Sequence, residues 1–215
     1  MNLTADFEID KKLRTRKTLL WFGLISIVML FAGLTSAYIV RQGEGKWAQF
    51  SLPITFIIST LVILLSSIPM QLAVKAASQG KQGELIKYLI ITLILGFGFV
   101  IAQFFAWSDL ITNGIHLTGD LSQIKTDYTY IPASSETMAA AGGVGNVAAS
   151  FLYVITALHI LHLVGGILAL FVVLSRAVRK KYTSADYSGV SMCALYWHFL
   201  DGLWIYLFLF LYFNR

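Results

Sequence analysis

Two apolar stretches near the end of the chain carry the side chains that could do chemistry. The stretch "SFLYVITALHILHLVGGILAL" holds His159 and His162, and the stretch "ALYWHFLDGLWIYLFLFLYF" holds His198 and Asp201. The members of each pair are three residues apart, so on a helix they share one face, separated by about 4.5 Å of rise. Ionisable groups in such apolar surroundings are costly and need partners. These four residues are therefore the candidate site.

Three kinds of chemistry fit three histidines and a carboxylate in a membrane. His198 with His159 or His162 could supply two axial ligands to a haem held between facing helices. Imidazoles and carboxylates are also typical parts of a proton relay or transporter site, although the chain lacks the inverted halves and broken helices of many transporters. The third interpretation is structural, with His159, His162, His198 and Asp201 forming a buried polar seam that locks two helices together. The residues alone leave these alternatives open.

The depth of the side chains predicts how this polar seam is paired. The two stretches run antiparallel as consecutive spans, and His162 and Asp201 lie about equally far from the same membrane surface. We therefore expect Asp201 to accept a hydrogen bond from His162 or His159, with His198 on the same seam. A protonated Asp201 is the alternative.

The composition identifies the elements that carry these residues as membrane spans. Of the 215 residues, 57% are hydrophobic and 13% are charged, whereas soluble domains have about 25% charged residues. Gly165 and Gly166 are small enough to let a neighbouring helix approach closely. The predicted fold is all-α, a polytopic bundle of five transmembrane helices. Five apolar stretches reach the roughly 20 residues that a helix needs to cross the hydrocarbon, namely Thr18–Val40, Phe50–Val74, Leu85–Trp107, Ala149–Ser175 and Gly189–Phe213.

The lysine and arginine residues predict the orientation of the bundle. Positive residues are enriched on the cytoplasmic side of a membrane, so we expect a cytoplasmic N-terminus and an external C-terminus. The net charge of +5 then reflects the membrane topology and does not indicate nucleic-acid binding. Twelve of the sixteen lysines and arginines fall on one side if the spans alternate, namely Lys11, Lys12, Arg14, Arg16, Lys17, Lys75, Lys81, Lys87, Arg176, Arg179, Lys180 and Lys181.

The chain divides into a basic cytoplasmic N-terminal tail, residues 1–17, and one membrane domain, residues 18–215. A long external loop, residues 108–148, is expected to be solvated or, alternatively, to dock a neighbouring subunit. Trp21 and Trp107 lie near opposite span ends and are expected to act as interfacial anchors.

No metal site and no catalytic residue are predicted in this chain. Cys193 is the single cysteine, so no disulfide framework is possible. A copper centre would need thiolates and imidazoles clustered together. His116, in the long loop, is expected to be a solvated residue and not a ligand.

The last two spans also contain two recognisable patterns. The fourth is similar to S-x-F-Y-x-x-T-G-x-H-G-x-H-x-x-x-G, and the residues that carry the likeness are Ser150, Phe151, Tyr153, Thr156, His159, His162 and Gly166. The fifth fits Y-W-H-F-x-D-x-x-W, with matches at Tyr196, Trp197, His198, Phe199, Asp201 and Trp204. In consecutive helices and in this order, the two patterns resemble the end of subunit III of the haem–copper cytochrome c oxidases.

Weaker similarity to this family extends through the first three spans. It is carried by "LLWFGLISIVMLFAGLTSAYIVR", by "LPITFIISTLVILLSS" and by Gln103. With five spans, the chain looks like the shorter bacterial form of the family, which lacks the first two helices of the seven-helix form. Where three family glutamates stand, this chain has Ile27, Ala106 and Ser191. Any role of those carboxylates in proton handling or lipid binding therefore does not transfer.

The resemblance implies an accessory subunit of a terminal respiratory oxidase, a proton-translocating oxidoreductase of the bacterial cytoplasmic membrane. In the family, subunits I and II hold the haems and coppers and reduce oxygen. Subunit III binds the side of subunit I, holds phospholipid and helps to sustain proton uptake and enzyme lifetime.

The expected partners are therefore subunits I and II, or a larger respiratory supercomplex, and the expected ligand of this non-catalytic chain is phospholipid. Tyr196, Trp197 and Trp204 are expected in packing or lipid contact. Three alternatives stay open: subunit III of a quinol oxidase, the accessory protein of nitric oxide reductase, and a free-standing haem b anchor.

Overall fold

Within the residues that it describes, the computed structural model of the protein contains five long helices and two short strands. It describes residues 3–43, 47–117, 125, 128–131, 147–184 and 186–214. Each helix contains a segment long and apolar enough to cross a membrane. The predicted bundle of five transmembrane helices is confirmed. The helices are α1 (Leu3–Gly43), α2 (Ile54–Ser78), α3 (Gln82–Thr112), α4 (Val147–Val178) and α5 (Ser188–Phe213).

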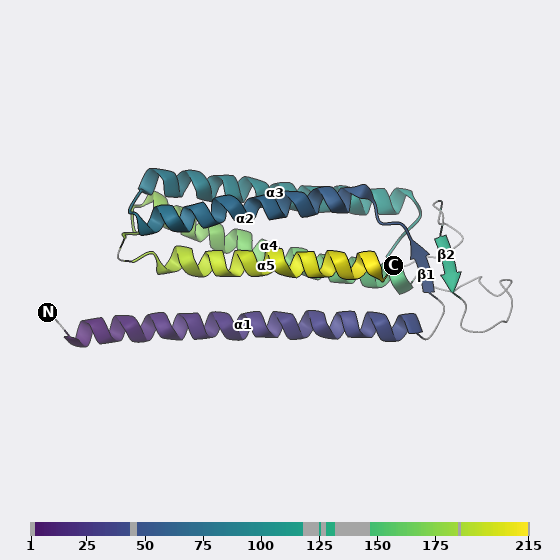
Figure 1. The fold of residues 1–215 in the computed structure, drawn as a ribbon, viewed down its shortest axis with the longest axis horizontal. Coiled ribbons are helices and arrows are strands. Elements are labelled where there is room, and N and C mark those ends of the chain that lie inside the picture. Colours follow the sequence, from purple (N-terminus) through teal and green to yellow (C-terminus); the bar gives the residue numbers. More distant parts are fainter. Residues whose placement is uncertain are drawn as a thin grey trace.

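Helices α2 to α5 pack against one another as a bundle, and α1 lies along its side (Figure 1). Phe31 and Tyr38 are almost fully buried on the side of α1 that meets the bundle. The Thr35 hydroxyl lies 3.0 Å from the Tyr206 hydroxyl of α5, and the Tyr38 hydroxyl donates to the Asn214 carbonyl at 2.9 Å. The contact of α1 with the bundle thus follows one stripe of the helix, and most of its other side chains are exposed.

Glycines bring the helices of the bundle close together. A Cβ atom on Gly96 of α3 would lie 2.7 Å from the ring of Trp197, so only glycine leaves room for this indole. A Cβ atom on Gly166 of α4 would lie 3.2 Å from Leu200 and 3.4 Å from Tyr196 of α5. The prediction that Gly166 lets a neighbouring helix approach closely is confirmed. Because lipid tails are as apolar as the side chains, such close packing is a main source of helix association in membranes.

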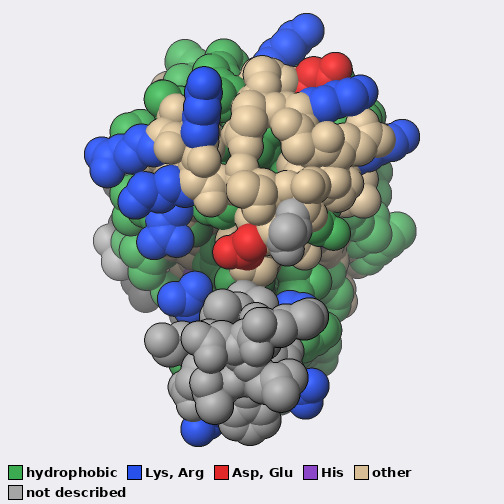
Figure 2. All heavy atoms as spheres, turned by 90° about the vertical axis from the view of Figure 1, so that its left-hand side faces the viewer, with side chains coloured by type: hydrophobic (Ala, Val, Ile, Leu, Met, Phe, Trp, Pro, Cys, Tyr) green, Lys and Arg blue, Asp and Glu red, His purple; other side chains and the backbone are tan. Residues whose placement is uncertain are grey.

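The start of α1, the α2–α3 turn and the α4–α5 connection lie at the same end of the molecule, which we call the basic end (Figure 1). Gly80 permits the tight α2–α3 turn, because its φ of +71° is in the left-handed region. The spans alternate as the lysine and arginine pattern predicts. The side of the membrane that this end faces stays a prediction. Figure 2 shows basic side chains around this end. The exposed basic residues of α2, α3, α4 and the α2–α3 and α4–α5 connections are Lys75, Lys81, Lys87, Arg176, Arg179, Lys180 and Lys181.

A two-stranded sheet lies at the opposite end. Strand β1 (Trp47–Phe50) pairs antiparallel with β2 (Tyr128–Ile131), and Trp47 is opposite Ile131. The predicted start of the second span at Phe50 is therefore wrong. The helix begins four residues later, at Ile54, because Pro53 has a φ of −58° that suits a helix start and has no N–H to place in a helix.

The other segment boundaries differ by at most five residues from those expected, except at the start of the first helix. Helix α3 continues to Thr112 and α4 begins at Val147, so both edges of the predicted loop 108–148 are helical. Residues 118–124, 126–127 and 132–146 of this loop lie outside the described residues, and its role stays a prediction. Helix α1 begins at Leu3, so most of the basic segment 1–17 continues the first span as helix.

Candidate functional site

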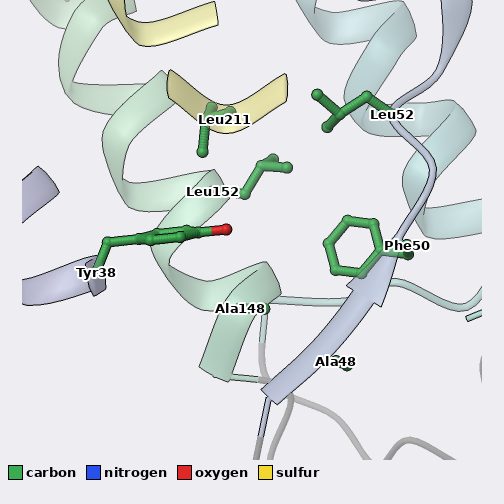
Figure 3. Close-up of a pocket in the computed structure, with 7 residues that line it drawn as sticks. All are labelled: Tyr38, Ala48, Phe50, Leu52, Ala148, Leu152 and Leu211. Atoms are coloured by element: carbon green, nitrogen blue, oxygen red, sulfur yellow. The ribbon is translucent and has the colours of Figure 1, made fainter. Parts of the chain in front are cut away.

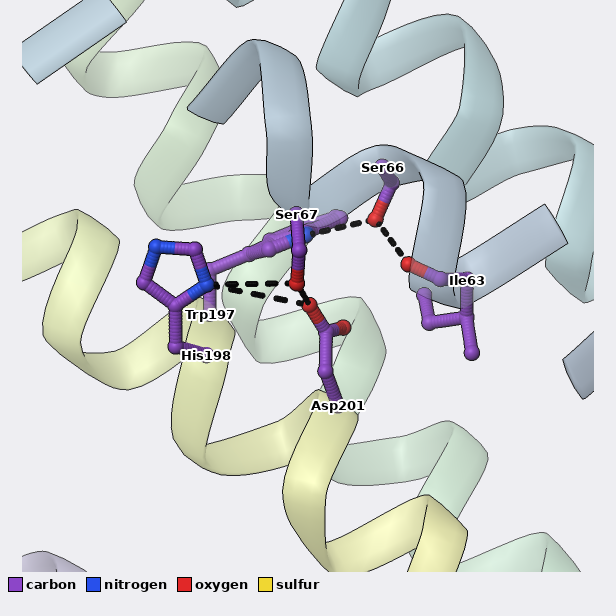
Figure 4. Close-up of polar contacts among 6 residues, drawn as sticks. All are labelled: Ile63, Ser66, Ser67, Trp197, His198 and Asp201. Carbon is purple, nitrogen blue, oxygen red and sulfur yellow. Dashed lines mark hydrogen bonds and ion pairs between the residues drawn. The ribbon is translucent and has the colours of Figure 1, made fainter. Parts of the chain in front are cut away.

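Asp201 of α5 is held by helix α2. Its Oδ2 atom accepts a hydrogen bond from the Ser67 hydroxyl (Figure 4). The Nδ1 atom of His198 lies 3.2 Å from Ser67 Oγ and 4.0 Å from Asp201 Oδ2. Because the only hydroxyl proton of Ser67 goes to Asp201, His198 Nδ1 donates to the Ser67 oxygen. Ser67, His198 and Asp201 form an imidazole–hydroxyl–carboxylate cluster that joins α2 to α5.

This cluster is buried on one side and open on the other. The side chain of Asp201 is 4% exposed, whereas that of His198 is 34% exposed. Asp201 Oδ1 and His198 Nε2 are both buried atoms and have no hydrogen-bond partner within the described residues. Polar atoms without partners are expensive in an apolar medium, so the cluster leaves part of its hydrogen-bonding capacity unused.

The two histidines of α4 do not join the cluster. His159 is fully buried against Trp204, with a ring-centroid distance of 4.9 Å. Neither of its ring nitrogens has a hydrogen-bond partner in the described part of the chain. The Nδ1 atom of His162 lies 2.7 Å from the Leu158 carbonyl of its own helix. The expectation that Asp201 pairs with His159 or His162 is therefore wrong, and the four residues do not form one seam.

The direction of the side chains explains this difference. Leu200 is the residue of α5 nearest to Gly166 of α4, followed by Tyr196 and an edge of the Trp197 ring. Asp201 follows Leu200 directly, and one residue turns a helix by about 100°. Asp201 therefore points away from α4 and towards α2. Equal depth in the membrane places two residues at one level but does not make them face each other.

Four hydroxyl residues supply the contacts on α2, and we call them the α2 hydroxyls: Ser59, Thr60, Ser66 and Ser67. Ser66 accepts the indole N–H of Trp197 at 2.9 Å, and Thr60 accepts that of Trp204 at 3.0 Å. Ser59 accepts the side-chain amide of Gln103 on α3, also at 2.9 Å. These three α2 hydroxyls donate their own protons to α2 carbonyls one turn back, so their oxygens remain acceptors for neighbouring helices.

Sequence reasoning missed the α2 hydroxyls because serine and threonine commonly bond to the preceding turn of their own helix. A signal was nevertheless present in the spacing. Trp197 and Trp204 are seven residues apart, which returns to nearly the same helix face after two turns, and their acceptors Ser66 and Thr60 are six residues apart on the antiparallel α2. Hydroxyl residues at nearly the spacing of two tryptophans indicate contact between the two helices.

Replacing Thr60 by valine is expected to lower the free energy of unfolding by about 1 kcal/mol. Valine has nearly the same shape as threonine, but it offers no acceptor to the fully buried indole N–H of Trp204. Thermal unfolding of the purified chain in detergent measures the effect. Thr112→Val is the matched control, because the exposed Thr112 hydroxyl bonds, within the described residues, only to the Asp109 carbonyl of its own helix. Equal unfolding temperatures of the two variants would contradict this role of Thr60.

Other predicted residues also form contacts between or within helices. Tyr196 donates to the His162 carbonyl at 3.1 Å, which links α5 to α4. Trp107, expected as an interfacial anchor, donates its indole N–H to Thr156 of α4 at 3.2 Å. Trp21 on α1 is 54% exposed. The indole of Trp107 thus joins two helices of this chain.

The structure shows one small apolar pocket away from the cluster, next to the sheet (Figure 3). The Tyr38 hydroxyl points into it but already donates to the Asn214 carbonyl. Within the described residues, no three His, Cys, Asp or Glu side chains gather as they would around a metal ion. Cys193 is buried in α5, and His116 is half-buried beyond the end of α3. The pocket is lined by Tyr38, Ala48, Phe50, Leu52, Ala148, Leu152 and Leu211.

Comparison with known proteins links this geometry to a family. Residues 108–215 match the family described as "Cytochrome c oxidase subunit III". A protein of Mycobacterium leprae (strain TN), "Probable cytochrome c oxidase subunit 3", is 32% identical, over 92% of this chain and 86% of its own length. The chain belongs to the cytochrome c oxidase subunit III family. The "Probable cytochrome c oxidase subunit 3" of Nocardia farcinica (strain IFM 10152) is 31% identical, over 92% of this chain and 86% of its own length. A "Cytochrome c oxidase subunit 3" of Corynebacterium diphtheriae (strain ATCC 700971 / NCTC 13129 / Biotype gravis) is 27% identical, over 86% of this chain and 82% of its own length.

Membership of the cytochrome c oxidase subunit III family confirms the resemblance drawn from the last two spans, and with the five spans it makes the chain a multi-pass membrane protein. The positions that lack the family glutamates lie in three different environments. Ala106 is fully buried in α3, Ile27 is half-buried on α1, and Ser191 is exposed on α5. A carboxylate at Ala106 would have to be accommodated in the apolar core, which this chain fills with a methyl group.

Proposed function

We propose that this chain is the accessory subunit III of a haem–copper terminal oxidase, where it stabilises subunit I and supports the proton uptake that accompanies oxygen reduction. The redox centres are assigned to the partner subunits and none to this chain. The names of the relatives favour cytochrome c oxidase over a quinol oxidase or nitric oxide reductase. Members of this family assemble with other oxidase subunits, so the chain acts within an oxidoreductase complex.

The observation that carries a scaffolding role is the use of the polar groups of α5. Asp201 is held by Ser67, and the indoles of Trp197 and Trp204 are held by Ser66 and Thr60. These contacts fix α5 against α2 at successive levels of the membrane. A rigid pair of helices of this kind supports a neighbouring subunit without a chemical step of its own.

The arrangement of the histidines gives no support to the haem b anchor. Two axial ligands would need imidazoles that face each other across a haem. His198 instead faces Ser67 of α2, while His159 lies against the rings of Trp204 and Phe99, at 4.9 and 5.9 Å. The two imidazoles thus belong to different helix contacts.

The setting of the protein follows from the same proposal. The basic end faces the cytoplasm, in accord with the distribution of positive residues in membrane proteins. The membrane is the cytoplasmic membrane of a bacterium. Subunits I and II are the direct partners, within a larger respiratory supercomplex where one exists, and phospholipid is the ligand.

Purification of the tagged chain from its native membrane tests this function. We expect it to copurify with haem-containing and copper-containing subunits, and the reduced-minus-oxidised spectrum of the complex to show their haems. The chain separated from these subunits is expected to show no b-type band. Purification without haem subunits would refute the proposal, and a b-type band from the separated chain would favour the haem anchor instead.

A further inference from the structure

A strip of polar side chains runs along the outer side of the contact between α2 and α5. We call Ser67, Gln71, Ser191 and His198 the polar strip. Gln71 and Ser191 are exposed, Ser67 is half-buried and the side chain of His198 is 34% exposed. Gln71 lies one turn after Ser67 on α2, and Ser191 lies two turns before His198 on α5. Because the two helices are antiparallel, both steps lead from the cluster towards the basic end.

No other described helix covers this strip. In Figure 1, α2 and α5 lie at the front of the molecule, and α1 lies beside α5 on the side away from α2. The contact between Thr35 of α1 and Tyr206 agrees with this placement, because Tyr206 lies on another side of α5 from Asp201. The polar strip is therefore an outer surface of this chain.

The outer face of α3 shows what a lipid-facing surface of this bundle looks like. Its exposed side chains include Ile90, Ile94, Phe97, Ile101 and Phe105, all of which are apolar. At the same depths, the polar strip carries polar side chains in place of apolar ones. Gln71 lies seven residues from the end of α2, or about 10 Å, and His198 lies ten residues from the start of α5, or about 15 Å, which is half of a hydrocarbon core of about 30 Å.

Polar side chains at these depths are costly against lipid tails. Ionisable and amide groups within membrane spans usually face other helices or a water-filled cavity. The unpaired Nε2 atom of His198 and Oδ1 atom of Asp201 are themselves buried, so the outer surface of the strip consists of the exposed Gln71 and Ser191 side chains and the exposed part of the His198 ring. The exposure of the polar strip in the separate chain thus indicates a polar neighbour in the membrane.

We propose that the polar strip is the docking surface for one transmembrane helix of the haem-containing partner subunit, and that this helix carries hydrogen-bonding side chains at the levels of Gln71 and Ser191. The inference rests on the proposed function and specifies which face of the chain that partner covers. The docked helix must carry polar side chains, because a purely apolar helix would leave the polar groups of the strip without hydrogen-bond partners, just as lipid tails do. The apolar outer face of α3 is left to lipid.

Photo-crosslinking in native membranes tests this interface. A benzophenone amino acid is placed at Gln71 or, as the control, at Ile90 of the full chain. Ile90 is 41% exposed and lies eight residues from the start of α3, so its depth matches that of Gln71. After irradiation and purification through a tag on the chain, mass spectrometry identifies the adducts. We expect position 71 to give an adduct with a haem-containing subunit in several-fold higher yield than position 90, and a probe at Ser191 to repeat the result.

The outcomes separate the interface from the function. Adducts of position 71 with phospholipid only, or equal yields from positions 71 and 90, overturn the interface if the chain still copurifies with haem subunits. A nitroxide at position 71 that collides freely with a water-soluble nickel reagent in the complex reveals a water-lined surface and also overturns it. If the wild-type chain purifies without haem subunits, the proposed function itself fails and the interface fails with it.

Discussion

Replacing Gly96 by alanine is expected to destabilise the bundle by roughly 1–3 kcal/mol, although alanine is the better helix former. The added Cβ would lie 2.7 Å from Cη2 and 3.1 Å from Cζ2 of the Trp197 ring. The ring cannot move aside easily. Its N–H is bonded to Ser66 at 2.9 Å, and its other edge lies 3.6 Å from the Cβ position of Gly166. Either the indole hydrogen bond breaks or α3 shifts away from α5.

Gly98 provides the matched control on the same helix. A Cβ atom there would lie 3.7 Å from Val62, which is an ordinary contact, so Gly98→Ala is expected to keep or slightly raise the thermal unfolding temperature. A smaller ring should also reduce the penalty, and Gly96→Ala is therefore expected to cost less in a Trp197→Phe background than in the wild type. A full penalty in both backgrounds would mean that the indole is not the obstacle.

The elements of this fold were predictable because they depend on length and polarity. Five apolar stretches of sufficient length, separated by polar segments, define five spans without any knowledge of packing. The Gly166 contact was also predictable, since a helix can approach closely only where side chains are small. The errors at the span ends have local causes. Phe50 is as apolar as the residues of a span, but Pro53 sets where the helix begins.

The sheet was not predictable because its strands are short and distant in sequence. Trp47–Phe50 and Tyr128–Ile131 have four residues each and are separated by two spans. Neither is long enough to show a clear alternation of polar and apolar residues. Their pairing depends on the tertiary fold, which brings the ends of α1 and α3 together.

The partner of Asp201 was not predictable from depth. Histidine is an obvious partner for a carboxylate, and the preceding helix α4 has two histidines at a similar level. The decisive variable is the rotational position of the residue on its helix, which turns Asp201 towards Ser67 of α2. Ser67 could not be recognised as this partner from the sequence, because serines in helices commonly bond to carbonyls of their own helix. Choosing correctly required knowledge of which helices are neighbours of α5 on each side.

Replacing Asp201 by alanine is expected to cost roughly 3 kcal/mol in the association of α2 with α5. The substitution removes the acceptor of Ser67 and leaves this hydroxyl and the His198 imidazole without their carboxylate. Because α2 and α5 also present the polar strip, the oxidase should retain less of this chain during purification and lose activity faster during turnover. The haem spectrum should not change, since the haems are assigned to the partner subunits.

Asparagine at the same position separates the hydrogen bond from the charge of Asp201. Its side-chain oxygen can still accept from Ser67 and its volume is nearly that of aspartate, so Asp201→Asn should restore most of the retention if the hydrogen bond is what holds α2 to α5. Behaviour equal to that of Asp201→Ala would mean that the negative charge is required. Subunit content is measured by quantitative gel analysis and durability by the half-life of activity during turnover. An Asp201→Ala oxidase with wild-type values of both would show that the α2–α5 contact does not depend on this carboxylate.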